Sequence, residues 1–398
     1  MPLEKSPLHG PVGHIAELAD QCVQCGLCLP VCPTYALDRN EAESPRGRIA
    51  IAAALARGEV DPTAGLRGHL DHCLGCLSCE KVCPAHVQYG ELLIQTRALL
   101  GPRASRPRWL PGLIKRPALL RVLRRVGSLV ALPRWKNRLL IRLRTASAWR
   151  AALSSLPVNA PATALKAQRA PDDDRPHLAL FPGCVASVDD AEAEHAALRL
   201  LHAAGFRVSV LPAFCCGAMD LHNGETRGFE QAARRVRQAW QASAASQLLT
   251  VTPGCLDTLR RALPGVPVID PLALLAQHAE SLRFRPLAQR VAVHLPCTQV
   301  NVAGSDAGLL QLLRRIPELE VLPLSRPPHC CGAAGSHALE FPERAARLRE
   351  ASLRQLVALD PQLWLSSNIG CRLHLAAGAA APPSRHPLSL LAQQLDSP

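Results

Sequence analysis

Two cysteine runs near the amino terminus decide how this chain begins to fold. The first reads Cys22-Val-Gln-Cys25-Gly-Leu-Cys28-Leu-Pro-Val-Cys32-Pro33, and the second reads Cys73-Leu-Gly-Cys76-Leu-Ser-Cys79-Glu-Lys-Val-Cys83-Pro84. In each run the first three thiolates lie on one tight loop, from which they can reach three corners of one iron–sulfur cube. The fourth cysteine begins the next segment, and the proline after it bends the chain away, toward a second cube.

The repeated spacing C-x2-C-x2-C-x3-C-P predicts two [4Fe–4S] clusters with crossed ligands. One cluster is predicted to be bound by Cys22, Cys25, Cys28 and Cys83. The other is predicted to be bound by Cys32, Cys73, Cys76 and Cys79. Structural zinc is the alternative, but zinc needs one tetrahedral set of ligands, not four cysteines in each of two runs. His72 and His329, each next to a cysteine, could hydrogen-bond to sulfur but are expected to be partly exposed polar residues.

The rest of the composition describes a large folded chain. It has 398 residues, sixteen of them cysteine, and 48% of its residues are hydrophobic, which predicts two or three domains. The first twenty residues carry prolines and glutamates instead of a basic start and an apolar run, so no export signal is expected. The thiols are therefore predicted to stay reduced in the cytoplasm and to bind metal. No stretch approaches the ~18 apolar residues of a membrane-spanning helix.

The positive charge is concentrated in one segment. Residues 101–150 hold fourteen Lys or Arg and no Asp or Glu, while the net charge of the whole chain is +13. Leu, Ile and Val alternate with these arginines, and Trp109, Trp135 and Trp149 are spaced among them. The pattern predicts peripheral contact with the inner face of the cell membrane, or docking of an acidic partner subunit. A solvated helical linker is the plain alternative, and no motif supports binding of nucleic acid.

The chain repeats itself beyond residue 176. Three pairs of strings match: Leu178–Cys184 with Val291–Cys297, Phe214–Ala218 with His329–Ala333, and Leu249–Cys255 with Leu365–Cys371. The offsets are 113, 115 and 116 residues, which indicates a duplicated module.

Each repeat alternates short apolar runs with helical stretches. Residues 178–181, 206–211 and 247–251 are typical of buried strands, and 189–204 and 228–245 are typical of helices. Such alternation predicts a parallel sheet covered by helices, with ligands at the carboxyl ends of the strands. Four cysteines follow strand-like runs: Cys184, Cys255, Cys297 and Cys371.

The predicted fold class is therefore α+β with several domains. We expect a helical domain with two [4Fe–4S] clusters, a basic helical connector and two α/β modules. Their predicted bounds are 1–100, 101–175, 176–285 and 286–398.

The repeated strings also resemble a known family. Each repeat carries one cysteine, then Cys-Cys-Gly, then a last cysteine, which is similar to the cysteine-rich CCG domain of heterodisulfide reductases. Paired ferredoxin runs followed by two CCG modules resemble the iron–sulfur subunits of glycolate oxidases over nearly the whole chain. Further strings support this resemblance: Pro45-Arg46-Gly47-Arg48-Ile49, Cys215-Cys216-Gly217-Ala218-Met219-Asp220, Cys330-Cys331-Gly332-Ala333-Ala334-Gly335 and Asn368-Ile369-Gly370-Cys371-Arg372-Leu373-His374-Leu375.

The resemblance implies an electron-transfer subunit that is not catalytic alone. A partner subunit with FAD would oxidise glycolate to glyoxylate, and this chain would pass the electrons singly to a quinone-type acceptor. Lactate and anaerobic glycerol-3-phosphate dehydrogenase subunits look similar, although the string around His374 favours glycolate. The chain has neither a G-x-G-x-x-G after a strand nor a Walker loop, so neither FAD nor NAD is expected on it.

The cysteines of the two repeats form weaker candidate sites. The full CCG pattern ends in C-x2-C, whereas Thr258 and His374 stand at the last position here. The second repeat could hold a further iron–sulfur cluster or another metal. Its candidate ligands are Cys297, Cys330, Cys331, Cys371 and His374. The first repeat offers Cys184, Cys215, Cys216 and Cys255, for which buried inert thiols are the alternative. Thiol–disulfide chemistry, the remaining functional alternative, would need an intact cluster there.

Overall fold

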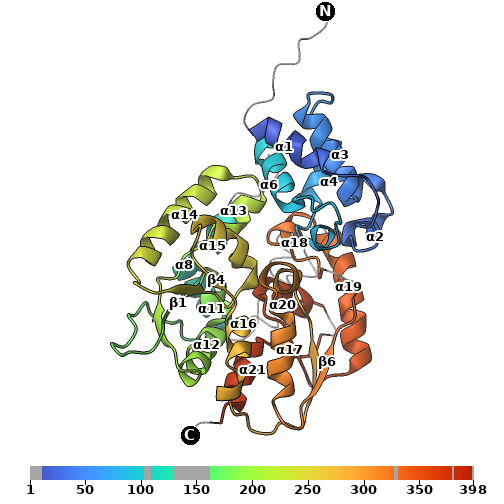
Figure 1. Cartoon of the computed structure of the whole chain (residues 1–398). Coiled ribbons are helices and arrows are strands. Elements are labelled where there is room, and N and C mark those ends of the chain that lie inside the picture. The colour runs from blue at the N-terminus through green and yellow to red at the C-terminus, as the bar shows by residue number, and fades with distance from the viewer. Residues whose placement is uncertain (1–10, 103–108, 130–161, 327–329, 379–380, 397–398) are drawn as a thin grey trace, which may run out of the picture. The chain divides into compact units, whose positions relative to one another are not determined.

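The computed structural model describes residues 11–102, 109–129, 162–326, 330–378 and 381–396 (Figure 1). Much of the basic segment, with Trp135 and Trp149, lies outside these described residues, and so does His329. The chain forms two compact units. The amino-terminal unit comprises Met1–Arg106 and Met219–Gly228, and the repeat unit comprises Pro107–Ala218 and Phe229–Pro398. The bounds of the four predicted domains stay predictions.

The described part of the amino-terminal unit is helical around its cysteine loops. Its helices are α1 (Pro11–Asp20), α2 (Pro33–Asp38), η1 (Glu41–Glu43), α3 (Pro45–Ala56), α4 (Ala64–Asp71), α5 (Ser78–Lys81) and α6 (Tyr89–Leu100). Ser44 begins α3, because its hydroxyl accepts the Gly47 N–H and Pro45 fixes the first helical residue. Helices α1, α3 and α6 pack together through a core that includes Ile15, Ala52 and Leu92.

The segment Met219–Gly228 completes the amino-terminal unit from a distant part of the sequence. Arg97 on α6 donates from Nη1 to the carbonyl of His222 at 2.8 Å. Gly224, with φ +73°, lies against the backbone of Arg97 so closely that a Cβ there would be 2.4 Å from its carbonyl carbon. Only glycine combines this conformation with this approach.

The repeat unit contains two four-stranded parallel sheets, as the alternating pattern predicts. The first has the order β2-β1-β3-β4, and the second has the matching order β6-β5-β7-β8. The strands are β1 (His177–Leu180), β2 (Arg207–Val210), β3 (Gln247–Leu249), β4 (Val268–Ile269), β5 (Arg290–Val293), β6 (Glu320–Pro323), β7 (Leu363–Leu365) and β8 (Ser384–Arg385). The same strand order in both sheets is the structural form of the duplication.

The remaining described helices follow residue 106 in the sequence, and of these α13 lies mostly in the segment Met219–Gly228 of the amino-terminal unit. They are α7 (Trp109–Ile114), α8 (Pro117–Leu129), α11 (Ala186–Asp189), α12 (Ala191–Ala203), α13 (Ala218–His222), α14 (Thr226–Gln241), α15 (Leu256–Ala262), α16 (Pro271–Gln277), α17 (Asp306–Arg314), α18 (His337–Glu340), α19 (Pro342–Leu359), α20 (Ile369–Ala376) and α21 (Pro387–Gln394). The short helices η2 (Pro253–Cys255), η3 (Ala279–Ser281) and η4 (Gln299–Ala303) complete the set. Helix α14 ends four residues before the predicted 245, because the chain turns at Ala244 with φ +53°.

Four helices join the two repeats within the repeat unit. Helix α12 of the first repeat packs on α21 of the second, and α16 of the first packs on α17 of the second (Figure 1). One core cluster contains buried residues of both sheets, among them Leu180 and Val293. Asp190 accepts a hydrogen bond from Arg372 across this junction, and both side chains are buried. The two repeats therefore share a hydrophobic core and form a single compact unit.

Candidate cluster-binding site

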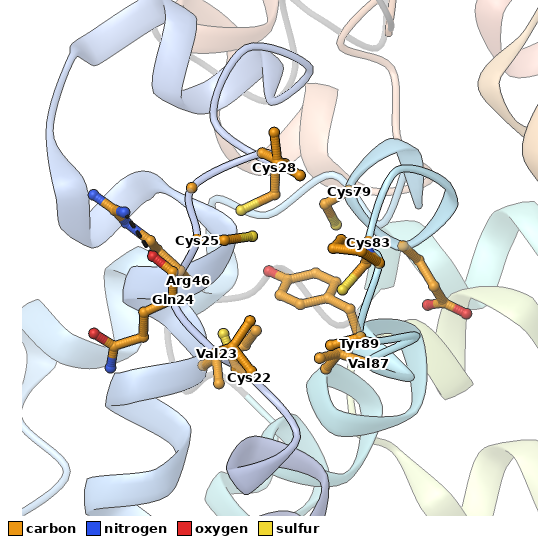
Figure 2. Close-up of a pocket in the computed structure, with 16 residues that line it drawn as sticks. Cys22, Val23, Gln24, Cys25, Cys28, Arg46, Cys79, Cys83, Val87 and Tyr89 are labelled. Carbon is orange, nitrogen blue, oxygen red and sulfur yellow. Dashed lines mark hydrogen bonds between the residues drawn. The ribbon is translucent and has the colours of Figure 1, made fainter.

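The first cavity of the amino-terminal unit is lined by cysteines from both runs (Figure 2). Its volume is about 440 Å³, part of it open to solvent. The cysteines in its lining are Cys22, Cys25, Cys28, Cys79 and Cys83. Arg46, Glu80 and Tyr89 also line it, and Figure 2 shows the Tyr89 ring between the first cysteine loop and Cys83.

Left-handed backbone turns shape both cysteine loops. Gln24 and Gly26 have φ of +55° and +82°, so the first loop turns back between its thiols. Gly75 and Leu77 have φ of +59° and +58° at related places in the second loop. Each loop thus curls within a few residues and carries three thiols on one short bend. Glycine suits position 26 mainly because of its positive φ, and a Cβ there would also be 3.0 Å from Nη1 at the end of the Arg46 side chain.

The second cavity is lined by the other group of cysteines. Its volume is about 300 Å³, and Arg48 and Tyr89 are among its lining residues. Its cysteines are Cys32, Cys73, Cys76 and Cys79. The fourth cysteine of each run thus lies at the cavity of the opposite run, and Cys79 and Tyr89 line both cavities. The structure brings together the residues of both predicted ligand sets, although the sets themselves stay predictions.

The described cysteine sulfurs are not gathered tightly enough to surround a single metal ion. Four thiolates around one zinc ion at about 2.3 Å would lie about 3.8 Å apart. Among the described residues, no three cysteine sulfurs lie within 4.8 Å of one another. A cube that takes one thiolate at each of four corners needs the wider separation. The donor set of cysteines from both runs at each cavity therefore suits a [4Fe–4S] cluster.

Arg48 is a buried cation in the lining of the second cavity. Its side chain is 1% exposed, and its hydrogen-bonding groups have protein partners. Nε donates to the His69 carbonyl at 2.6 Å, Nη1 to Thr34 Oγ1 at 2.9 Å and Nη2 to Glu43 Oε2 at 2.6 Å. Burial raises the pKa of the Cys73 thiol, but the charges of Arg48 and Arg97 outweigh it and leave that pKa below its usual value. Tyr89 also donates its hydroxyl to Cys73 Sγ at 3.4 Å.

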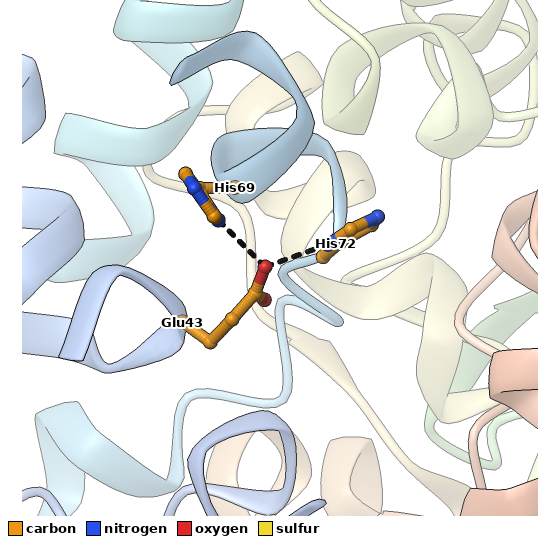
Figure 3. Close-up of side chains that lie close together, drawn as sticks. All are labelled: Glu43, His69 and His72. Carbon is orange, nitrogen blue, oxygen red and sulfur yellow. Dashed lines mark hydrogen bonds and ion pairs between the residues drawn. The ribbon is translucent and has the colours of Figure 1, made fainter. Parts of the chain in front are cut away.

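The Glu43 carboxylate binds two histidines, His69 and His72 (Figure 3), and also accepts a hydrogen bond from Arg48. Nδ1 of His69 and Nδ1 of His72 lie 2.8 and 2.7 Å from Glu43 Oε1, while Arg48 holds Oε2. Burial opposes ionisation of Glu43, yet the bonds from His72 and His69 and the Arg48 charge lower its pKa to about 2. Among the described residues, Glu43, His69 and His72 form the group of three possible metal ligands that lie within 4.8 Å of one another. Both carboxylate oxygens of Glu43 already have hydrogen-bond partners, so we interpret the three residues as a hydrogen-bonded cluster that holds Arg48 in place.

The sequence does not predict this trio. It indicates only that His72 is a partly exposed polar residue, and the His72 side chain is indeed 26% exposed. Glu43 lies 29 residues before His72, and such a distance leaves no local pattern that could signal the contact. The one local hint is that His69 and His72 are three residues apart at the end of α4, where side chains share a helix face.

The first repeat arranges its four thiols in a row. Cys215 hydrogen-bonds to Cys184 and to Cys216, and Cys216 also bonds to Cys255. The bonds from Cys184 and Cys216 lower the pKa of Cys215 to about 3, while the pKa values of Cys184 and Cys216 rise. Thr258, at the place of the missing cysteine, is fully buried, and its Oγ1 has no hydrogen-bond partner among the described residues.

The second repeat forms an equivalent, more deeply buried row. Cys330 bonds to Cys297 and to Cys331, and Cys331 bonds to Cys371. Three of these four residues are buried, against one of four in the first repeat. His374 is buried too, and its Nε2 donates to the carbonyl of Ala345 at 3.1 Å, so only Nδ1 could serve as a ligand. Burial, aided by the charge of Arg349, lowers the pKa of His374 to about 4.

Comparison with known proteins places this arrangement in a family. The model of the 4Fe-4S dicluster domain matches residues 18–87, and that of the cysteine-rich CCG domain matches 178–260 and 291–376. The glycolate oxidase iron–sulfur subunit of Escherichia coli K12 is 30% identical to this chain over 94% of each protein. The chain belongs to the glycolate oxidase iron–sulfur subunit family.

Other members and relatives of the glycolate oxidase iron–sulfur subunit family span similar lengths. A probable glycolate oxidase iron–sulfur subunit of Bacillus subtilis is 28% identical over 90% of this chain and 88% of its own length. A dihydromethanophenazine heterodisulfide reductase chain of Methanosarcina barkeri is 22% identical over 91% and 89%. The family assignment makes this chain an iron–sulfur protein.

A solved structure shares the fold of this iron–sulfur subunit. The crystal structure of a hypothetical protein from Helicobacter pylori has a TM-score of 0.52 and 10% identity, covering 100% of this chain and 74% of that one. In the described part of the chain, no helix has both the length and the apolar character to cross a membrane.

Proposed function

We propose that this chain is the electron-transfer subunit of a flavin-dependent glycolate oxidase complex. A partner subunit with FAD oxidises glycolate to glyoxylate, and this chain passes the electrons to a quinone-type acceptor. The observation that carries the proposal is the pair of adjoining cysteine-lined cavities, which share Cys79 and Tyr89. The names of the relatives from Escherichia coli and Bacillus subtilis support glycolate as the substrate.

Each of the two cavities is proposed to bind one cluster, and electrons are proposed to pass between the two clusters. Bound in each, a [4Fe–4S] cluster would accept and release one electron at a time. The ligand sets proposed are Cys22, Cys25, Cys28 and Cys83 for the first cavity and Cys32, Cys73, Cys76 and Cys79 for the second. Cys25 is exposed between the exposed side chains of Val23 and Leu27, which gives a redox partner an apolar place to approach the first cavity. Cys32 and Cys79, which line the second cavity, are buried.

The electron count requires a partner. Conversion of glycolate to glyoxylate removes two electrons and two protons, and the electrons leave the substrate together as a hydride. A flavin can take that hydride and release electrons singly, whereas cysteine-bound iron carries no hydride. We propose that the flavin is on the partner and that neither FAD nor NAD binds this chain.

The CCG rows offer a place for a further iron–sulfur cluster. The second row is the stronger candidate, because three of its four cysteines are buried and Cys331 is hydrogen-bonded to both Cys330 and Cys371. Thiolate rows of this kind favour soft metals such as iron in clusters. The likeness to heterodisulfide reductases favours thiol–disulfide chemistry as a second function, but Thr258 and His374 replace the last cysteine of both repeats.

Helix α8 supports the proposed contact of the basic segment with a membrane. Leu119, Val122, Leu123 and Val126 are 40–57% exposed and recur along one stripe of this helix. Arg124 points the other way, to Asp189, with Nε 2.7 Å from the carboxylate. An apolar stripe facing outward from a segment with fourteen basic and no acidic residues suits an anionic lipid surface.

Anaerobic purification with natural partners tests the proposed function. We expect a flavoprotein to copurify, glycolate to reduce the complex, and iron to number about eight per chain, or about twelve with a CCG cluster. Cys25→Ser should remove iron and acceptor reduction while flavin reduction by glycolate persists. Cys255→Ser, in the weaker row, is the matched control and should leave those eight irons. Zinc in place of iron, or lactate or glycerol 3-phosphate as the better substrate, would contradict the proposal.

Vesicle flotation tests the membrane contact separately. The protein should float with phosphatidylglycerol vesicles and not with phosphatidylcholine vesicles, and the double change Val122→Glu and Val126→Glu should abolish flotation. Val357→Glu changes an equally exposed valine on α19 and is the control. Loss of flavoprotein binding without any vesicle binding would instead identify α8 as the docking surface for the flavoprotein.

A further inference from the structure

The two cavities differ in the charged groups around them. Arg46 lines the first cavity, but its side chain is 32% exposed and Glu41 binds it through Nε at 2.6 Å. Glu80 lines the same cavity and adds a carboxylate. Solvent and Glu41 therefore screen the Arg46 charge, and the described residues that line the first cavity include no buried cation.

The second cavity has Arg48 in its lining, almost without exposure to solvent. The guanidinium is fixed by bonds to the His69 carbonyl, Thr34 Oγ1 and Glu43, so it cannot turn away from the cavity without breaking several of them. Glu43 balances part of this charge, but it is not in the lining and also accepts from two histidines. Arg48 is thus the charged group that faces the cysteines.

Two further donors act on the loop that carries Cys73. Arg97, also buried, donates from Nη2 to the carbonyls of Leu70 and Cys73 at 2.6 and 2.9 Å. The Tyr89 hydroxyl donates to Cys73 Sγ. The second cavity therefore has two buried guanidinium groups and one buried carboxylate around it in the described part of the chain.

We propose that Arg48 is a positioning residue that raises the reduction potential of a cluster in the second cavity, so that a single transferred electron stays on that cluster. An electron adds negative charge to a group that four thiolates already make anionic. A fixed cation and a hydrogen bond to ligand sulfur both stabilise the added charge, and burial prevents water from screening them. The inference rests on the proposed two-cluster function and adds the direction in which the chain passes electrons.

The step itself is a simple exchange. A cluster held by Cys22, Cys25, Cys28 and Cys83 would lose one electron, and a cluster held by Cys32, Cys73, Cys76 and Cys79 would gain it. No bond to carbon forms or breaks, and no proton is required. The flavoprotein partner, or dithionite in the test tube, supplies the electron.

A potentiometric titration followed by electron paramagnetic resonance tests the inference. The full chain is purified anaerobically, its iron and sulfide are counted, and the two one-electron midpoints are measured. We expect midpoints separated by at least a tenfold difference in reduction constant, which is 59 mV. Cys76→Ser, which alters a ligand of the second cavity, identifies the signal that belongs there and should change the higher of the two.

Variants of Arg48 and Glu43 should then shift the midpoint potential of the second-cavity cluster in opposite directions. Arg48→Met should lower the midpoint potential of the second-cavity cluster by at least 59 mV, which is a tenfold change in the reduction constant. Arg48→Lys keeps the positive charge and should lower that midpoint much less. Glu43→Gln removes the balancing carboxylate and should raise the same midpoint. Arg46→Met is the matched control, two residues earlier on α3, and should leave the second-cavity midpoint unchanged.

The outcomes separate two failures. Eight irons with equal midpoints, or a second-cavity midpoint insensitive to both Arg48 and Glu43, would overturn the role of Arg48 and leave the proposed function intact. Protein with zinc and no iron would overturn both. If Arg48→Met does not accumulate, the upward shift in Glu43→Gln decides the matter alone.

Discussion

Asp270 begins α16 in the first repeat, and His386 begins the equivalent helix, α21, in the second. Asp270 Oδ1 accepts the Leu272 N–H at 3.0 Å, and His386 Nδ1 accepts the Leu388 N–H at 3.1 Å. Both side chains are buried, and each reaches into the other repeat: Asp270 Oδ2 accepts from Ser305 Oγ at 2.6 Å, and His386 Nε2 donates to the Val251 carbonyl at 3.1 Å. Both repeats therefore have a helix cap that also bonds to the other repeat, but a carboxylate supplies it at Asp270 and an imidazole supplies it at His386.

The cysteine rows show the same combination of fixed backbone and changed chemistry. In both repeats a glycine with φ of about +90° follows the cysteine pair, at Gly217 and Gly332. The residue three places after the last cysteine differs: the Thr258 hydroxyl has no partner in the described chain, whereas His374 is bonded to a carbonyl. Conformation is therefore the constant element of the duplication, and ionisable groups are the part that varies.

The largest expected effect comes from a bond that one repeat supplies to the other. Arg372→Met would leave the buried carboxylate of Asp190 without its cation, so we expect the free energy of unfolding to fall by about 3–5 kcal/mol. Urea denaturation measures this. Arg290→Met, which breaks an exposed pair with Glu320, should cost less than about 1 kcal/mol. Equal losses in the two variants would contradict the importance of the cross-repeat pair.

The glycines test whether the two repeats are alike where the backbone is concerned. A Cβ on Gly217 would be 2.8 Å from Ala232 Cβ, and one on Gly332 would be 2.8 Å from Leu348 Cβ. Gly217→Ala and Gly332→Ala should each lower the free energy of unfolding by about 2–4 kcal/mol, from strained φ and from crowding. Gly265→Ala has positive φ but no close neighbour among the described residues, so thermal unfolding should show a smaller loss there. A large loss in only one repeat would break the equivalence.

The capping residues should respond to pH in opposite directions. Burial raises the pKa of Asp270 to about 6, so its contribution to stability falls as pH rises from about 4 to 6. Burial, with the charge of Arg372, lowers the pKa of His386 to about 3, so its contribution rises with pH from about 3 to 6.5. Relative to the parent protein, Asp270→Asn should gain stability by about 1 kcal/mol per pH unit between pH 4 and 6.

His386→Asn should show the reverse slope, because asparagine can cap the helix without titrating. Relative to the parent, it should lose about 1.4 kcal/mol per pH unit as pH rises from 4 to 6. Urea denaturation at pH 4, 5 and 6 measures both slopes. Two variants whose curves run parallel to the parent would show that neither cap titrates as described.

The smallest effect is expected at Thr258. Thr258→Val removes a buried hydroxyl that has no partner in the described chain and keeps the shape, so stability should stay the same or rise by about 1 kcal/mol. Thr96→Val removes an equally buried hydroxyl that donates to the Leu92 carbonyl at 2.7 Å and should lower stability by about 1 kcal/mol. A marked loss in Thr258→Val, measured by thermal unfolding, would mean that the hydroxyl has a ligand or a water in the folded protein.

Local patterns in the sequence predict the elements well. The α3 helix, the strands β1 to β3 and the cysteine loops all follow from period, proline position and cysteine spacing, which are properties of neighbouring residues. Even the capping of α16 could be anticipated, because Asp270-Pro271 is a usual helix start.

Contacts between distant residues could not be predicted in this way. Glu43 meets His72 across 29 residues, and Asp190 meets Arg372 across 182, so neither pair leaves a periodic trace. The outward apolar stripe of α8 is also a product of folding: the sequence indicates an amphipathic helix but not which face the repeat unit covers. The candidate cysteines are thus predictable, and the charged groups that would tune them are not.

The discontinuity of the amino-terminal unit has a consequence for dissecting the gene. A fragment that stops before the basic segment would contain every ferredoxin cysteine but lack Met219–Gly228. Arg97 would lose the His222 carbonyl, and the surface of α6 that Gly224 covers would be bare. The amino-terminal unit is therefore not expected to fold as an isolated fragment, and its last segment is synthesised only after β1 and β2 of the first repeat have been translated.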